Sequence, residues 1–134
     1  MSSFGPTGKG IVIREAHFPG RAQIDAYGNG GFRFADMSHR GSLLLLPSGI
    51  YGWEMDETMP LSVENFRRVL DDAADIEVLL VGTGSKLRPL PAELKAALKA
   101  KGIASDPMGT GAAIRTFNIM LAEQRAVAAA LIAV

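Results

Sequence analysis

The stretch 77-EVLLVGTG-84 decides the fold of this 134-residue chain. Its apolar run, Val78-Leu79-Leu80-Val81, ends at a glycine without any alternating polar residue, which is typical of a strand buried on both faces of a sheet. We therefore predict a strand over Glu77 to Val81, followed by two helix-strand repeats. The loop 82–90 would then lie at the carboxyl end of this strand, where open α/β sheets bind ligands or partners.

The two repeats carry clear helix signals. A helix over 91–101 is predicted because a proline suits its first position and Gly102 suits the residue after its end. A second helix is predicted to open within 109-GTG-111 and to run to about Arg125, with its threonine as the cap. Short strands complete the pattern at 103–107 and 127–132. The connections between the parallel strands should be right-handed.

The first half of the chain reads as a β meander. A flexible arm is predicted over 1–10, which holds three glycines and a proline, and a single domain over 11–134. Four leucines within 41–47 predict a second strand buried on both faces, which should pair with the strand at 77–81. Earlier strands are predicted from β-branched or alternating residues at 11–13, 22–27 and 32–34, with a glycine-rich turn at 28–31.

An amphipathic helix is predicted over 60–75. Its apolar residues recur at helical spacing, its charged residues are left for solvent, and Ser62 is placed to cap the first turn. The residues expected to face the core are Val63, Phe66, Val69, Leu70 and Ala73.

Composition excludes several classes of function. Lys plus Arg and Asp plus Glu are 14 each, so no net field attracts the chain to nucleic acid. The absence of cysteine excludes disulfides and thiolate metal sites and fits a reducing compartment. The start lacks the pattern of a secretory signal, and the longest apolar run, 126–134, is about half the roughly 20 residues that a membrane helix needs. We expect a cytoplasmic protein that is not integral to a membrane.

Known catalytic and cofactor motifs do not match. The loop 82-GTGSK-86 is similar to phosphate-binding loops, but four residues separate Lys86 from the predicted helix at 91–101, and the third glycine of a dinucleotide fingerprint is replaced by Leu87. A structural turn is the favoured interpretation and nucleotide binding the alternative. The two histidines, His17 and His39, have neither metal-ligand spacing nor the sequence context of a catalytic nucleophile, so we predict no metal site and no catalytic residue.

The two Gly-Thr-Gly sequences nevertheless indicate one candidate surface. Because neighbouring parallel strands end at the same edge of a sheet, Thr83 and Thr110 should approach each other there, with Arg115 one helical turn further along. Arg115 and Asn118 share a face of the last helix. Arg115 is either a buried tie between helix and sheet or an exposed contact, and both interpretations remain open. The candidate surface comprises Gly82, Thr83, Gly84, Thr110, Arg115 and Asn118.

A family resemblance rests mainly on 108-MGTGAAIRTFNIMLAEQRAVAAALI-132, with 78-VLLVGTG-84, Leu90-Pro91 and Gly102-Ile103 in support. The chain resembles, from about Ile11 to Ile132, a small family of bacterial and archaeal proteins of unknown biochemical function. That family includes a mitochondrial complex I (NADH:ubiquinone oxidoreductase) assembly factor and an adipogenesis-associated protein with a Mth938 domain. The resemblance implies a three-layer, Mth938-like α/β fold. In this fold a mixed central sheet includes a C-terminal βαβαβ unit and has helices on one face. An N-terminal β hairpin forms a further layer beside it.

The resemblance also implies a type of function. It indicates a non-catalytic protein that binds protein partners such as respiratory complex subunits. We expect no cofactor, and whether the chain forms a homo-oligomer stays open. The alternative is a small-molecule binding protein or enzyme that uses a cleft between the two Gly-Thr-Gly loops. A concave cleft with Arg115 exposed would favour the alternative, whereas a cleft filled by Trp53 and Met108 would not.

Overall fold

The computed structural model describes residues 18–134, so the predicted arm, the predicted strand at 11–13 and His17 lie outside the described residues. A small sheet consists of β1 (Ala26–Gly28), β2 (Gly31–Phe34) and β3 (Met37–Arg40). A large sheet consists of β4 (Ser42–Leu46), β5 (Gly49–Trp53), β6 (Val78–Gly82), β7 (Ala104–Met108) and β8 (Val127–Leu131). The helical segments are η1 (Glu64–Phe66), α1 (Arg67–Asp71), η2 (Ala73–Asp75), α2 (Ala92–Ala100) and α3 (Thr110–Ala122).

The large sheet is mixed and has the strand order β5-β4-β8-β6-β7. Strand β6 pairs in parallel with β7 and with β8, which confirms the predicted C-terminal βαβαβ unit. Strand β4 is antiparallel to both β5 and β8. The predicted pairing of the leucine strand with the Val78 strand is therefore wrong. The last strand of the chain lies between them, because its small, fully buried residues suit a central position in the sheet.

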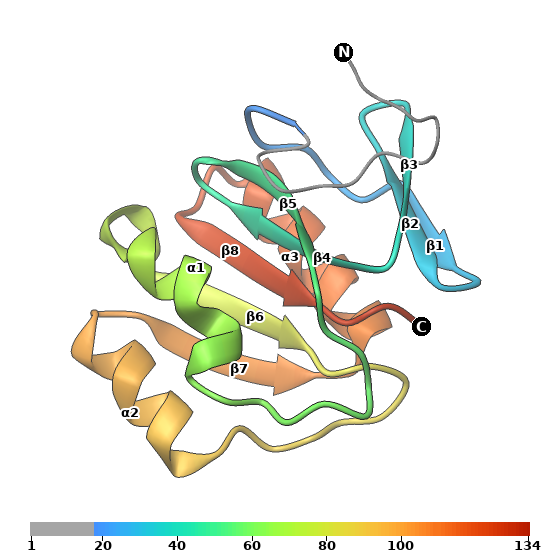
Figure 1. Ribbon diagram of the computed structural model, residues 1–134. Coiled ribbons are helices and arrows are strands. Elements are labelled where there is room, and N and C mark those ends of the chain that lie inside the picture. Colours follow the sequence, from blue (N-terminus) through green and yellow to red (C-terminus); the bar gives the residue numbers. More distant parts are fainter. Residues whose placement is uncertain (1–17) are drawn as a thin grey trace.

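Three layers follow from the alternation of side chains along the large sheet. Leu44 and Leu46 face α1 and α2, whereas Leu43 and Leu45 face α3 and the small sheet. Figure 1 shows α1 and α2 in front of the large sheet, α3 behind it and the small sheet at one end. Helices thus cover both faces, which corrects the expectation of helices on one face only. The three-layer α/β class itself is confirmed.

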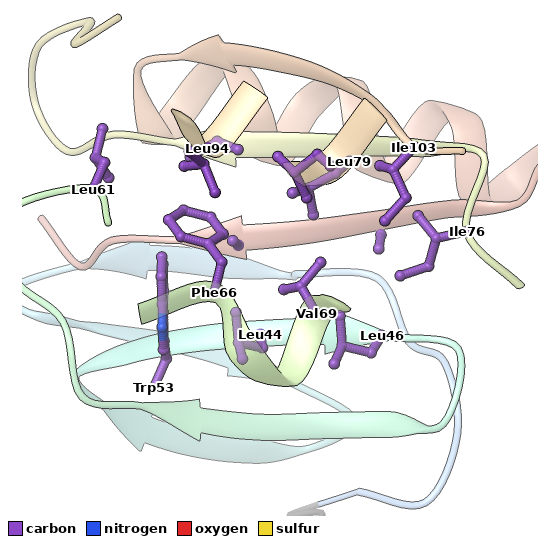
Figure 2. Packing of buried hydrophobic residues seen from close by; sticks show 14 of the residues in the cluster. Leu44, Leu46, Trp53, Leu61, Phe66, Val69, Ile76, Leu79, Leu94 and Ile103 are labelled. Atoms are coloured by element: carbon purple, nitrogen blue, oxygen red, sulfur yellow. The ribbon is translucent and has the colours of Figure 1, made fainter. Parts of the chain in front are cut away.

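The predicted helix over 60–75 is broken into η1, α1 and η2. Phe66 and Asp72 interrupt it, since their ψ angles of 17° and 16° lie outside the helical range. The expected apolar residues still point inward, and Figure 2 shows Phe66 and Val69 among the core residues opposite the sheet. The Phe66 ring packs edge-on against Trp53, with 5.2 Å between ring centroids. Ser62 accepts a hydrogen bond from the Asn65 amide at 3.3 Å, close to the capping role predicted for it.

The small sheet has three strands where a hairpin of two was predicted. Strand β1 begins four residues later than expected and pairs with β2, which pairs in turn with β3. Phe32 and Phe34 of β2 are buried against the large sheet, while Tyr27 of β1 remains 44% exposed. Strand β3 was not predicted, because its mostly polar sequence, Met37-Ser38-His39-Arg40, has no buried face.

The last two helices match their predictions closely. Helix α2 buries Leu94 and Leu98, and Gly102 follows it with a φ of 81°, which favours glycine. Helix α3 ends at Ala122, three residues before the predicted Arg125. Within residues 18–134, no helix combines the length and the hydrophobicity needed to cross a membrane.

Candidate functional site

The two Gly-Thr-Gly sequences are in direct contact at the carboxyl ends of β6 and β7. The Thr83 amide donates to the Met108 carbonyl at 2.8 Å, which extends the β6-β7 ladder by one bond. The Thr110 amide, at the start of α3, donates to the Gly84 carbonyl at 2.8 Å. The parallel strands therefore bring the two loops together at one edge of the sheet, as the sequence analysis predicted for Thr83 and Thr110.

The Thr110 hydroxyl is the centre of this junction. It accepts a hydrogen bond from the Gly84 amide at 3.0 Å and donates one to the Ile132 carbonyl at 2.7 Å. The side chain is fully buried. Thr110 was predicted to cap α3, but Gly109 occupies the N-cap position, so the hydroxyl instead joins the end of β6 to the segment after β8.

The Thr83 hydroxyl is also used inside the protein. It donates to the Lys86 carbonyl at 2.7 Å and accepts from the Arg88 amide at 3.0 Å, which closes the loop after β6. At Gly82 there is no room for a side chain, because a Cβ would lie 3.0 Å from the Thr110 Cα. These residues form a tight joint between strand ends.

The exposed side chain of Glu57 binds the loop that follows β6. Its Oε2 accepts hydrogen bonds from the Ser85 amide at 2.8 Å and from the Ser85 hydroxyl at 2.7 Å. These two hydrogen bonds lower the pKa of the Glu57 carboxyl, and the bond from the Ser85 hydroxyl has the larger effect. The nearby Arg88 charge lowers this pKa further. Gly84 has a φ of 109°, and a Cβ there would collide with the Glu57 carboxylate. The positive φ is what favours glycine at this position, since the Glu57 side chain is able to move aside.

Asn118 binds the segment that precedes β1. Its Oδ1 accepts from the Ile24 amide at 2.9 Å, and its Nδ2 donates to the Ile24 carbonyl at 2.9 Å. The side chain thus pairs with the backbone of Ile24 as a neighbouring strand would, and it holds this segment against α3.

Arg115 is exposed, and within residues 18–134 its guanidinium has no hydrogen bond or ion pair. The Tyr27 side chain extends from β1, and its hydroxyl occupies the space where a Cβ of residue 111 would lie, with the Arg115 guanidinium beside that space. Ile119 follows one turn along α3 and is 61% exposed. We refer to Tyr27, Arg115 and Ile119 as the α3 patch. Tyrosine and arginine are enriched among the residues that contribute most to protein-protein binding.

Sequence reasoning missed Tyr27 and Glu57. Gly111 was the one sequence signal that could have indicated the position of Tyr27, because a glycine in the first turn of a helix leaves room for another side chain. Glu57 lies 28 residues before Ser85 in a segment without periodicity, so no local pattern linked them.

A sequence profile described as a protein family of unknown function (DUF498/DUF598) matches residues 24–132. The chain belongs to this family. A Bartonella henselae crystal structure, described as an outer membrane protein, is 63% identical with a TM-score of 0.83, over 87% of this chain and 98% of that one. A Bordetella pertussis solution structure, described as a Mth938-like domain, is 28% identical with a TM-score of 0.70, over 83% of this chain and 85% of that one. The predicted Mth938-like fold is thereby confirmed.

A curated mouse relative is named NADH dehydrogenase [ubiquinone] 1 alpha subcomplex assembly factor 3. It is 31% identical over 91% of this chain, which spans 66% of the mouse protein. The resemblance to the family that includes the complex I assembly factor is therefore confirmed.

Proposed function

We propose that this protein assists the assembly of a respiratory NADH:ubiquinone oxidoreductase by binding protein partners, without catalysing a reaction. The observation that carries the proposal is the named role of the mouse relative, whose likeness extends over 91% of this chain. The family match over residues 24–132 includes the large sheet and all three α-helices. A role that depends on the shape and surface of this domain would be available to both proteins.

The arrangement of the candidate residues supports binding through a surface in preference to a cleft. Thr83, Gly84 and Thr110 are buried and hydrogen-bonded to the protein itself. A small molecule could enter between the two loops only if the bonds from Thr110 to Gly84 were broken. We therefore favour protein binding over the small-molecule alternative, and we propose the exposed α3 patch as the contact surface.

Affinity capture tests this proposal. The tagged full-length chain is expected to retain subunits of NADH:ubiquinone oxidoreductase from native lysate, and Arg115→Ala is expected to lose them. Arg67→Ala is the matched control, because Arg67 is an exposed arginine on α1, across the large sheet from α3. Wild-type chain that retains none of these subunits would contradict the assembly role. Equal retention by Arg115→Ala would exclude the α3 patch as the contact surface.

The cytoplasmic location stays a prediction, and the capacity to form a homo-oligomer stays open. Cell fractionation tests the first, since the description of the Bartonella henselae protein would place this chain with the outer membrane instead. Sedimentation of the purified chain over a range of concentrations tests the second.

A further inference from the structure

A groove runs between α2 and the outer edge of β7, on the far side of the large sheet from the α3 patch. The groove is open to solvent and has a volume of about 560 Å³. The residues that line it are Lys95, Ala96, Lys99, Gly102, Ile103, Ala104 and Ser105. Most of these contribute apolar or small side chains. The groove is therefore able to accommodate small apolar side chains beside the strand.

Strand β7 ends the large sheet and, among the described residues, pairs only with β6. The Ala104 amide donates to Glu77 and the Met108 carbonyl accepts from Thr83, so alternate residues of β7 point their backbone groups toward β6. In a parallel ladder the intervening residues point theirs outward, and here these include Ser105 and Pro107. The open edge lies directly beside the groove.

The open edge of β7 is able to pair with one short added strand but not with a long one. Ser105 presents an outward amide and carbonyl, whereas Pro107 has no amide to donate. The Ile103 amide is already bonded to the Leu98 carbonyl at 3.0 Å. Ser105 is therefore the one donor on this stretch of edge. Proline on an edge strand is a common protection against extended sheet pairing.

Charge on the groove indicates the chemistry of its occupant. Lys95 and Lys99 are exposed and lie one turn apart on the wall formed by α2. None of the described residues that line the groove is acidic. Asp106 belongs to the opposite face of β7, because neighbouring residues of a strand alternate. An extended segment with acidic side chains would meet both ammonium groups while its backbone paired with Ser105.

We propose that this groove binds an extended acidic segment of a partner protein, which adds a short strand to β7 beside Ser105. The surface is separate from the α3 patch, and the inference does not depend on the identity of the partner or on an assembly role. It goes beyond the proposed function by assigning a second contact site and the chemistry of its ligand.

Titration of the isotope-labelled full chain with a capped peptide of alternating aspartate and valine tests the proposal by NMR. We expect saturable shifts of the backbone amides at 104–106, and none with a matched peptide of alternating lysine and valine. Lys95→Glu combined with Lys99→Glu should weaken binding by about fivefold or more. Lys86→Glu, the same charge change in the loop after β6, should alter it by less than about twofold.

Ser105→Pro provides an independent variant, because it removes an amide that has no partner within residues 18–134 and should leave the fold intact. We expect it to abolish the peptide shifts. Absent shifts with the acidic peptide on the wild-type chain, or equal binding of the lysine peptide, would overturn the proposal. Concentration-dependent shifts at 104–106 without peptide would overturn it too, since a second copy of the chain would then occupy the edge. The assay contains no respiratory subunits, so its failure is separable from failure of the assembly role.

Discussion

Replacing Thr110 by valine tests whether the Gly-Thr-Gly junction is a structural joint. The substitution keeps the shape of the side chain and removes its hydroxyl. The Gly84 amide, 3.0 Å away, loses its acceptor, and the Ile132 carbonyl, 2.7 Å away, loses its donor. Both groups would remain enclosed, because Thr110 is fully buried.

The expected cost follows from these two unsatisfied groups. Each buried polar group without a partner costs about 1 to 3 kcal/mol, so the loss of two such partners in Thr110→Val should lower the free energy of unfolding by about 2 to 6 kcal/mol. Thr110→Ser is the matched control, because it keeps the hydroxyl and loses one methyl group, at a cost of about 1 kcal/mol. The difference between the two variants isolates the hydroxyl.

Urea unfolding followed by fluorescence is a suitable assay, because the only tryptophan, Trp53, is buried against Phe66. The wild type, Thr110→Ser and Thr110→Val should unfold in that order from highest to lowest midpoint. If the valine variant were as stable as the serine variant, the hydroxyl would not join the strand ends as described. The junction would then be free to serve a ligand.

Three further perturbations test other parts of the structure. Leu44→Asp should lower the free energy of unfolding by more than about 3 kcal/mol, since it buries an unpaired carboxylate; an unchanged urea midpoint would show that β4 is not buried on both faces. Arg115→Ala should leave the thermal midpoint nearly unchanged, since an exposed side chain without an ion pair contributes little; a loss of several degrees would identify it as a buried tie. Hydrogen bonds from Ser85 lower the pKa of Glu57 in the folded state. The ionised carboxylate therefore stabilises the fold fully above the ordinary glutamate pKa of about 4.3, and this stabilisation is lost as the pH falls through the lowered folded-state pKa. Glu57→Gln should therefore melt below the wild type at pH ~6, and this difference should shrink as the pH falls below the ordinary glutamate pKa; a difference independent of pH would refute this assignment.

The sequence predicted the buried strands better than it predicted their neighbours. Uninterrupted apolar runs identified β4, β6 and β8, because a strand covered on both faces cannot carry polar residues. Such strands share the same pattern, so the pattern does not specify which of them pair. The insertion of β8 between β4 and β6 depends on packing across distant segments.

The candidate site was predictable in position and unpredictable in detail. Parallel topology alone places the residues after β6 and β7 at one edge, and the two Gly-Thr-Gly sequences do meet there. The use of the Thr110 hydroxyl depends on the Ile132 carbonyl, which the chain reaches only after α3 and β8. Asn118 likewise binds Ile24, 94 residues away, and no local spacing indicates that contact.

Deletion of the gene tests the assembly role most directly. The measurement is the amount of fully assembled NADH:ubiquinone oxidoreductase, resolved by native gel electrophoresis of membranes from the deletion strain. We predict that the assembled enzyme falls and partial assemblies accumulate, that the wild-type chain and Arg67→Ala restore it, and that Arg115→Ala does not. An unchanged amount of assembled enzyme in the deletion strain would contradict the proposed function.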